Sequence, residues 1–363
     1  MKVLFDTYAF RMQRFGGISR YFAELIRGLP QFGVRPRVFM PLVDNEHAES
    51  SQLSISGSTR FLSRHLKIRR AAHAALLRTD ALLRVLTRYD ILHRTYYTPI
   101  RYVSRRPAVC TIVDMIPELF PEHFGGVNPH QEKHRIADAS DLIFSISECT
   151  SRDIVSVFGI DRARIVTTPL GIDPARFASP LDTTNPFRAP YVLFVGNRIG
   201  YKNFRRMATA VAPILAGRPD LSLAIVGGGP LSDGEKGIFE AAGVVKNVHQ
   251  ANVPDSALPK IYREAQVFVF PSEYEGFGLP LLEAFASGCP VVASRASCFP
   301  EIGDEAIEYF DPKSTDEISH AIDRVVESSS RADKLRALGA ERVKVFPWTR
   351  TAERTAEGYR RLR

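Results

Sequence analysis

The sequence is poor in cysteine and has no long apolar run. Among its 363 residues the cysteines form no CxxC pair and lack zinc-finger spacing, which argues against a disulfide framework and a structural metal site. No apolar run approaches the ~20 residues that a membrane helix needs. We therefore expect a cytoplasmic protein with buried, reduced thiols. The cysteines are Cys110, Cys149, Cys289 and Cys298.

The composition is that of a globular protein, with 45% hydrophobic and 24% charged residues, which excludes a disordered chain. Asp6 follows only three apolar residues, so the amino-terminal run predicts a strand and not a signal peptide. Strand-like runs such as AVCTIVD and YVLFVG alternate with helix-length amphipathic segments. Residues 169–190 include five prolines, from Pro169 to Pro190, and the alternation restarts after them, which indicates a linker between domains.

This alternation predicts an α/β protein with two Rossmann-like, doubly wound parallel-sheet domains facing a cleft. We expect an N-terminal domain over residues 1–170, a linker over 171–190 and a C-terminal domain over 191–345. Residues 346–363 predict a final helix that packs back on the N-terminal domain. Ligands of open α/β folds bind beyond the carboxyl ends of the strands, so functional residues are expected in the strand-to-helix loops.

The most informative loop lies in the stretch FPSEYEGFGLPLLEAFASGCPVVAS. It leads from an apolar run into a helix with Pro280 in its first turn, where proline costs no hydrogen bond. Gly276 and Gly278 allow the backbone to approach a ligand closely, and free amides at the start of a helix favour phosphate. Glu275 and Glu283 flank these amides and could face one ligand. Alternatively, Glu283 only favours the positive end of the helix and Glu275 is solvated.

This stretch resembles the signature of family 4 of the retaining glycosyltransferases, which have the GT-B fold, and the resemblance extends over nearly the whole chain. It implies that Glu275 contacts the sugar of a nucleotide diphosphate donor and that Glu283 contacts the ribose hydroxyls. It also implies donor contacts for the residues of the glycine loop. These are Gly276, Phe277, Gly278 and Leu279.

Two further loops carry cations or glycines. In VGNRIGYKN, Arg198 and Lys202 lie four residues apart on a turn that opens a helix, where two cations could clamp a diphosphate; a solvated turn is the alternative. The pair resembles the family's Arg…Lys element, which implies that it neutralises the donor diphosphate. In FGGISRYF, Gly16 and Gly17 resemble the family's glycine-rich loop over the donor phosphates, and Arg20 follows one turn later; a tight turn is the alternative.

Three other positions allow a structural as well as a functional interpretation. His93 resembles a family histidine on a strand-end loop, which implies a contact with the acceptor or the sugar, but a structural histidine fits equally. Asp114 follows Val113 where the family often has His-Asp, so it is our candidate for orienting the acceptor or the sugar. His130 and His134 predict one helix face, and without an HExxH motif we expect no zinc site.

Two sequence features concern the nucleotide and the metal. The turn GGGP at 227–230 lacks the GxGxxG spacing of a dinucleotide fingerprint, but it resembles a family turn on the nucleotide side. The family holds the base, largely through its backbone, at the place of residues 247–254. The sequence has no Asp-X-Asp triplet, with which glycosyltransferases of the other major fold hold a metal. We therefore expect no metal and no cofactor apart from the donor.

The resemblance implies a hexosyltransferase that moves a hexose from a nucleotide diphosphate sugar to a saccharide or lipid-linked acceptor in cell-surface polysaccharide synthesis. Similarity to bacterial polysaccharide mannosyltransferases favours GDP-mannose as the donor. The resemblance also implies that Arg198, Lys202 and the loop amides stabilise the negative charge of the leaving diphosphate. Two alternatives stay open: another GT-B enzyme, such as a sugar-nucleotide epimerase or a phosphorylase, and a non-enzymatic binder of anionic ligands.

Positive charge is concentrated in one segment. Of the net charge of +8, residues 60–88 supply +7, with eight Lys and Arg residues against Asp80. Phe61 is the only aromatic residue of the segment, which argues against nucleic-acid binding by base stacking. One interpretation is a pair of packed helices with a solvated basic face. The other is a peripheral contact with anionic lipids on the inner face of the plasma membrane, close to a membrane-bound acceptor.

Overall fold

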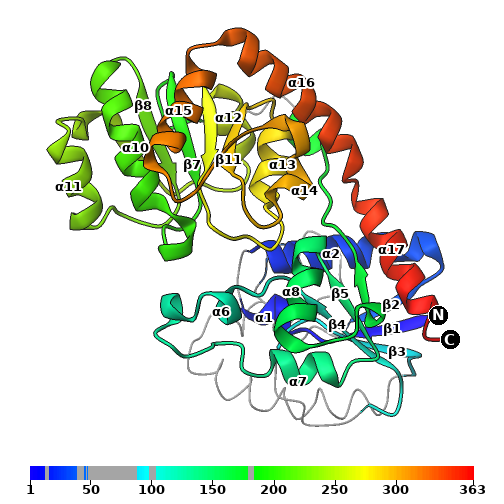
Figure 1. The fold of residues 1–363 in the computed structure, drawn as a ribbon. Helices are drawn as coiled ribbons and strands as arrows, with labels where there is room; N and C mark the ends of the chain where they lie inside the picture. Colours follow the sequence, from blue (N-terminus) through cyan, green and yellow to red (C-terminus); the bar gives the residue numbers. More distant parts are fainter. Residues whose placement is uncertain (13–15, 39–44, 46, 48–87, 98–103, 179–183) are drawn as a thin grey trace, which may run out of the picture. The chain divides into compact units, whose positions relative to one another are not determined.

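The computed structural model describes residues 1–12, 16–38, 45, 47, 88–97, 104–178 and 184–363. These residues form two compact units (Figure 1). The first unit consists of Met1–Met115, Asn128–Gly171 and Trp348–Arg363, and the second consists of Ile116–Val127 and Ile172–Pro347.

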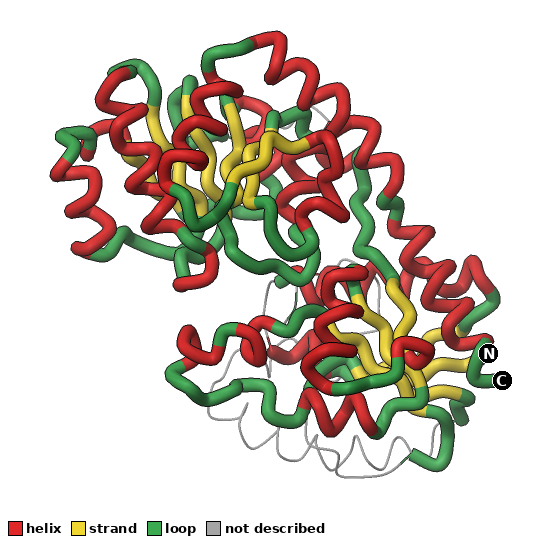
Figure 2. The backbone as a smooth tube through the Cα atoms, in the orientation of Figure 1, coloured by secondary structure: helices red, strands yellow, loops and turns green. Residues whose placement is uncertain are grey.

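The first unit is built on a parallel six-stranded sheet with the strand order β2-β1-β3-β4-β5-β6. Strands β3, β4 and β5 are buried along their whole length, as expected for a sheet that helices cover on both faces (Figure 2). The strands are β1 (Lys2–Phe5), β2 (Arg35–Val38), β3 (Ile91–Arg94), β4 (Ala108–Ile112), β5 (Leu142–Ser145) and β6 (Ile165–Thr167). The helices are α1 (Tyr8–Met12), α2 (Gly17–Gly28), α7 (Lys133–Asp138), α8 (Glu148–Phe158) and α17 (Trp348–Arg360).

The second unit repeats this architecture with the strand order β12-β11-β10-β7-β8-β9, again parallel throughout. The strands are β7 (Tyr191–Val195), β8 (Ser222–Val226), β9 (Val248–Ala251), β10 (Val267–Phe270), β11 (Val291–Ser294) and β12 (Ile307–Phe310). The helices are α6 (Ile116–Leu119), α9 (Ala175–Ala178), α10 (Phe204–Gly217), α11 (Asp233–Ala241), α12 (Leu258–Glu264), α13 (Leu279–Ala286), α14 (Phe299–Gly303), α15 (Thr315–Val326) and α16 (Ser329–Val345). The predicted pair of doubly wound parallel-sheet domains is therefore confirmed.

Position within the second sheet decides which loops can meet. Strand β7 lies between β10 and β8, and the three strands run parallel. The loops after all three therefore emerge at one edge of the sheet, with the β7 loop between the other two. The strands are held in place by a core that includes Phe194, Phe204, Met207 and Val211, each worth about 1.5–3 kcal/mol on burial.

Helix α17, at the end of the chain, belongs to the first unit. Tyr359 is fully buried, and its hydroxyl lies 2.5 Å from Nδ1 of His93 in β3. A Cβ atom at Gly358 would lie 2.5 Å from the ring of Phe144 in β5, so only glycine permits this close approach. Helix α17 thus packs directly against the strands of the first sheet.

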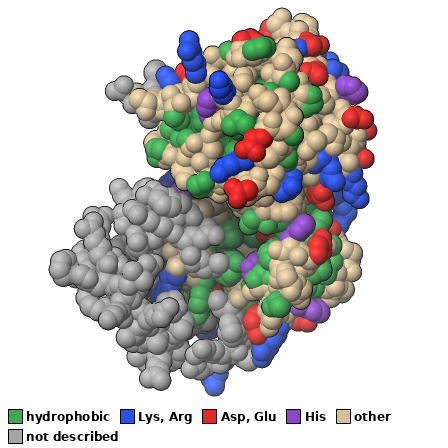
Figure 3. Space-filling model, turned by 90° about the vertical axis from the view of Figure 1, so that its left-hand side faces the viewer, with side chains coloured by type: hydrophobic (Ala, Val, Ile, Leu, Met, Phe, Trp, Pro, Cys, Tyr) green, Lys and Arg blue, Asp and Glu red, His purple; other side chains and the backbone are tan. Residues whose placement is uncertain are grey.

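Charged side chains of both signs are interspersed on the described surface that faces the viewer in Figure 3. Most of the basic segment, residues 60–87, lies outside the described residues, so the membrane contact predicted for 60–88 stays a prediction. None of the helices that the structure describes is long and apolar enough to span a membrane.

Candidate functional site

The glycine loop between β10 and α13 has a backbone that requires glycine. β10 ends at Phe270 and α13 begins at Leu279. Gly278, directly before the helix, has a φ of 91°, and a Cβ atom there would lie 3.2 Å from its nearest neighbour. The side chain of Phe277 is buried against Phe346, with 5.8 Å between the ring centroids. The donor contacts predicted for this loop therefore depend on its backbone amides and stay a prediction.

Lys202 and Glu275 form an ion pair at this loop. Lys202 ends the 3-10 turn η4 (Gly200–Lys202), and its Nζ lies 2.6 Å from Oε1 of Glu275. The hydroxyl of Ser272 donates to the same oxygen at 2.7 Å, and the hydroxyl oxygen of Ser297 accepts the backbone N–H of Glu275 at 3.1 Å. The two charged side chains are 17% and 12% exposed, so the pair is shielded from water but still reachable.

The sheet explains why residues so distant in sequence meet here. Lys202 follows β7 and Glu275 follows β10, and these strands are parallel neighbours. Sequence analysis predicted both charged residues but missed Ser272 and Ser297, which carry no motif of their own. Ser297 has a φ of 47°, a left-handed conformation that is uncommon outside glycine. In this conformation its hydroxyl lies within hydrogen-bond distance of the Glu275 amide.

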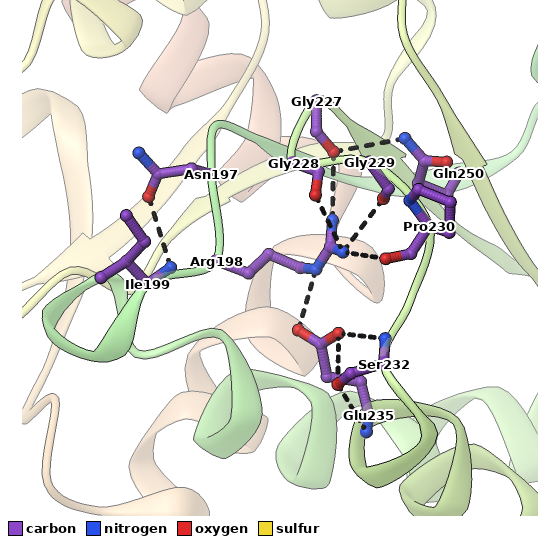
Figure 4. A network of polar contacts seen from close by, with 10 residues as sticks. All are labelled: Asn197, Arg198, Ile199, Gly227, Gly228, Gly229, Pro230, Ser232, Glu235 and Gln250. Atoms are coloured by element: carbon purple, nitrogen blue, oxygen red, sulfur yellow. Dashed lines mark hydrogen bonds and ion pairs between the residues drawn. The ribbon is translucent and has the colours of Figure 1, made fainter.

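Arg198 leaves the same loop toward β8 (Figure 4). Its Nε lies 2.8 Å from Oε1 of Glu235, and its other two nitrogens donate to the carbonyl oxygens of residues 227–230 at distances between 2.7 and 3.3 Å. The side chain is 6% exposed. The structure therefore gives Arg198 and Lys202 separate partners, where the sequence predicted one clamp.

Glu235 joins Arg198 to helix α11. Its Oε2 accepts the backbone N–H and the hydroxyl of Ser232 at 2.7 and 2.8 Å, which completes a capping box at the start of the helix. Burial by itself raises the pKa of Glu235, but the hydrogen bonds from Ser232 and from the Arg198 guanidinium outweigh it and hold the pKa below its ordinary value. Sequence analysis missed Glu235, although Ser-x-x-Glu before a helix is a recognisable cap.

Glu283, the second glutamate of the motif, is buried in α13 with 8% exposure. The hydroxyl of Tyr262 in α12 has a pKa well above its ordinary value because of burial and, second, because of the negative charge of Glu283. Glu283 thus lies near α12, and its predicted contact with ribose stays a prediction.

In the first unit, Gly16 and Gly17 lie at the start of α2, next to residues 13–15, which lie outside the described part. The carbonyl of Gly16 accepts the hydroxyl of Ser19 at 3.0 Å and the backbone N–H of Arg20 at 3.1 Å. The side chain of Arg20 is buried. The phosphate contact of this loop stays a prediction.

Asp114 lies beside a lysine that the sequence did not single out. Lys133 is fully buried at the start of α7, and its Nζ donates to the carbonyl of Asp114 at 3.0 Å and lies 3.8 Å from the carboxylate. The ammonium also lies 5.0 Å from the centre of the Tyr97 ring. Burial, and second the charge of Asp114, raise the pKa of Tyr96 to about 12. The predicted role of Asp114 toward acceptor or sugar stays a prediction.

His93 is a buried residue of β3 with both ring nitrogens engaged. Nδ1 lies 2.5 Å from the Tyr359 hydroxyl and Nε2 lies 2.8 Å from the Thr111 hydroxyl. The rings of Phe5 and Phe144 stack on it. Burial lowers the pKa of His93 to about 3, so the ring is neutral. The contact with acceptor or sugar that the sequence implies would require this ring to leave its position.

The expected helix face of His130 and His134 is wrong. Helix α7 begins after His130, at Lys133. His130 lies 2.7 Å from the Tyr96 hydroxyl, whereas His134 lies 3.5 Å from the carboxylate of Asp138 and stacks on Phe158. Within the described residues no cluster of His, Cys, Asp and Glu has the composition of a metal site.

Comparison with known proteins defines the family. The model of "Glycosyltransferase Family 4" matches residues 15–176 and that of "Glycosyl transferases group 1" matches residues 182–342. The O-antigen chain mannosyltransferase B of Escherichia coli is 31% identical over 286 residues, which are 74% of each chain. The chain belongs to glycosyltransferase family 4. It is therefore a glycosyltransferase enzyme. This favours the predicted transferase activity over an epimerase, a phosphorylase and a non-enzymatic binder.

Further relatives and solved structures agree. The MMP alpha-(1->4)-mannosyltransferase of Mycolicibacterium hassiacum is 30% identical over 231 residues, 62% of this chain and 55% of the relative. The crystal structure of HepE from Anabaena in complex with UDP has a TM-score of 0.71 at 17% identity and covers 99% of this chain and 100% of its own. WaaG, a glycosyltransferase involved in lipopolysaccharide biosynthesis, has a TM-score of 0.69 at 17% identity, with 98% of both chains covered. The GT-B fold predicted from the sequence is confirmed.

Proposed function

We propose that this enzyme transfers mannose from a nucleotide diphosphate sugar, with GDP-mannose the favoured donor, to a hydroxyl of a saccharide or lipid-linked acceptor. The observation that carries the proposal is the Lys202–Glu275 pair beside the glycine loop before α13. An ammonium group and backbone amides suit a diphosphate, and a carboxylate suits sugar hydroxyls. The mannosyltransferases among the relatives support mannose, and HepE, solved with UDP-glucose, supports a nucleotide sugar.

The reaction breaks the bond between the anomeric carbon and the diphosphate oxygen. Negative charge then collects on the leaving diphosphate while the sugar becomes oxocarbenium-like. Lys202 and the amides of Phe277 and Gly278 stabilise that charge, and a donor of this kind is worth about 2.7–4 kcal/mol. Glu275, fixed by Ser272, orients the sugar. The acceptor hydroxyl loses its proton to a leaving-phosphate oxygen and bonds to the anomeric carbon on the same face, which gives retention.

The first unit is proposed to supply two further groups. The amides of Gly16 and Gly17 would add hydrogen bonds to the donor phosphates, and Asp114 would orient the acceptor or the sugar. Because Lys202 and the amides provide positive charge, we propose that the reaction needs no metal. A chelator is then expected to leave turnover unchanged, and a loss that Mg²⁺ or Mn²⁺ restores would contradict this part of the proposal.

The proposal is tested by calorimetry and thermal shift with GDP, UDP and dTDP, followed by turnover with the matching mannose or glucose donors. A ligand that binds only the folded state stabilises it by about 2.7 kcal/mol at a hundred times its Kd. We expect GDP to give the largest shift and mannose to be transferred with its anomeric configuration kept. A shift with UDP but not GDP would reject the donor, and an inverted product would reject the mechanism.

An epimerase or a phosphorylase would behave differently in the same assay. A transferase releases nucleoside diphosphate from the donor only when an acceptor hydroxyl is present. A phosphorylase would form a sugar 1-phosphate from a saccharide and inorganic phosphate without a nucleotide donor, and an epimerase would convert the donor sugar without net release of nucleoside diphosphate. A peripheral membrane location is tested separately, by sedimentation with liposomes of increasing anionic lipid content, and sedimentation that does not depend on that content would reject it.

A further inference from the structure

The guanidinium group of Arg198 is hydrogen-bonded within the protein, mostly to one backbone turn. Each of its guanidinium nitrogens donates a hydrogen bond, either to Glu235 or to the carbonyl oxygens of residues 227–230. The side chains of Arg198 and Glu235 are 6% and 9% exposed. An arginine in this state reaches a diphosphate only if it gives up this pair and several hydrogen bonds at once.

The turn that Arg198 holds is unusual. Gly227, Gly228 and Gly229 have φ values of 90°, 71° and 71°, all in the left-handed region. Successive residues in this conformation bring their carbonyl oxygens together, and the guanidinium fork is where these oxygens meet (Figure 4). A Cβ atom at Gly228 would lie 2.6 Å from Nη1 of Arg198, so glycine is needed at this position for the arginine to approach.

Two backbone amides of the turn have no protein partner among the described residues. Within the part of the chain that the structure describes, the backbone N–H groups of Gly228 and Gly229 donate to no protein acceptor, and Gly228 is exposed. The N-terminus of α11, by contrast, is closed by its own Ser232–Glu235 cap. Consecutive backbone amides without a protein acceptor suit the oxygens of an anion or a hydroxyl group.

We propose that Arg198 is a positioning residue: with its charge neutralised by Glu235, it fixes the turn 227–230 so that the turn's amides meet the nucleoside diphosphate part of the donor. The identity of the ligand in this proposal rests on the proposed function. The fixing of the turn by Arg198 does not. A direct clamp and a positioning role predict opposite effects on ligand binding when the charge of Glu235 is removed. If Arg198 clamps the diphosphate, Glu235 competes with the ligand, and removing its charge strengthens binding. If Arg198 acts through the turn, removing that charge weakens binding.

The binding experiment is calorimetry with GDP, and UDP in parallel, on the full chain. We expect Glu235→Gln to weaken binding, and Arg198→Lys to weaken it about as much as Arg198→Ala, by about tenfold or more, because a point charge cannot replace a fork of parallel donors. Arg218→Lys is the matched control, since that arginine pairs with Glu327 outside this turn. Tighter binding by Glu235→Gln, or wild-type affinity in Arg198→Lys, would overturn the proposal.

Glu235 also caps α11, so a second variant separates its two roles. Ser232→Ala removes the capping hydroxyl, which contacts Oε2, and leaves Oε1 to Arg198. We expect Ser232→Ala to lower the melting temperature while it weakens GDP binding clearly less than Glu235→Gln does. Equal losses of affinity in the two variants would assign the effect to the cap and overturn the role of Arg198.

The last measurement needs no ligand. ¹⁵N relaxation of Gly228 and Gly229 is compared between the wild type and Arg198→Lys, with circular dichroism to verify folding. We expect the order parameters to fall from about 0.85, the value of rigid backbone, to below about 0.6. Unchanged order parameters would overturn the proposal. If the wild type binds neither GDP nor UDP, the proposed function fails while this comparison still decides whether Arg198 fixes the turn.

Discussion

Arg198 and Lys202 leave one loop, four residues apart, but they pair with carboxylates on the segments that follow the two different neighbours of β7, Glu235 after β8 and Glu275 after β10. Arg198 turns toward β8 and is neutralised by Glu235, with its remaining donors on backbone carbonyls. Lys202 turns toward β10 and pairs with Glu275, a side chain that stays partly exposed. The spacing of the two cations therefore does not give them a common protein partner, because β7 lies between two strands and each cation pairs with a residue that follows a different one.

The chemistry of the two side chains agrees with this division. A guanidinium is a rigid fork that matches several carbonyl oxygens at once, whereas an ammonium is a compact charge on a flexible stem. The buried arginine is suited to hold backbone, and the reachable lysine is suited to meet an incoming anion. Substitutions can break the two pairs one at a time.

Loss of the lysine charge is expected to have the largest effect. Lys202→Ala removes the ammonium group that stabilises the leaving diphosphate, and we expect kcat to fall about 10²–10³-fold. The measurement is steady-state turnover with the donor that the wild type uses. Lys260→Ala, which removes a half-exposed lysine paired with Glu264, should keep wild-type turnover. Near-normal turnover of Lys202→Ala in a folded protein would contradict the assignment.

His93 is a buried base without a carboxylate partner among the described residues. His93 has hydroxyl partners instead, and its pKa of about 3 lies below the ordinary 6.5. The unfolded chain therefore binds one more proton than the folded chain between these pH values, and stability falls as the pH drops below about 6.5. For this one group the loss approaches about 1.4 kcal/mol per pH unit.

The measurement is urea unfolding of the wild type and of His93→Gln at pH 7, 6 and 5. We expect the wild type to lose stability faster than the variant as the pH falls, because only the wild type must bury a neutral imidazole. His134→Gln, which changes an exposed histidine, should follow the wild type. Parallel curves for the wild type and His93→Gln would contradict the lowered pKa.

The glycine turn around Arg198 can be tested with two neighbouring substitutions. Gly228→Ala and Gly229→Ala both force alanine into a left-handed conformation, at a cost of about 1–2 kcal/mol in the free energy of unfolding. Only at Gly228 does the new methyl group also collide with Arg198, since nothing lies within 4 Å of a Cβ atom at Gly229. We expect Gly228→Ala to weaken GDP binding more than Gly229→Ala at similar thermal stability. Equal affinities would show that Arg198 does not act through this contact.

The smallest effect is expected at the hydroxyl that supports Glu275. Ser272→Ala removes one hydrogen bond to a charged oxygen, worth about 1.5–3 kcal/mol at most and less where Lys202 remains as a partner. We expect a several-fold lower kcat with little change in the affinity for GDP. Ser294→Ala is the matched control, because the buried Ser294 hydroxyl has no hydrogen-bond partner in the described part of the chain. The same kcat loss in both variants would rule out a positioning role for Ser272.

Much of the fold could be predicted because it depends on local patterns. Apolar runs such as 191–195 and 267–270 predict buried strands, and Pro280 with Gly278 predicts the start of α13. Lys202 and Glu275 could be predicted as site residues because both lie in glycine-containing loops between a strand and a helix. What failed was the expectation of a helix face for His130 and His134, since α7 begins only at Lys133 and tertiary contacts of Tyr96 and Phe158 decide where these side chains lie.

Partners could not be predicted, because no sequence pattern states which loops a strand order brings together. Ser272, Ser297, Glu235 and Lys133 carry no motif that links them to the residues they hold. Two parallel α/β sheets, the loops that bear glycine and charge, and the family could be read from the amino-acid sequence alone. The pairing of Lys202 with Glu275 and of Arg198 with Glu235 follows from the folded arrangement of the strands. The reason is that strand β7, fixed between β10 and β8 by packing, divides the cations of its loop between two neighbours.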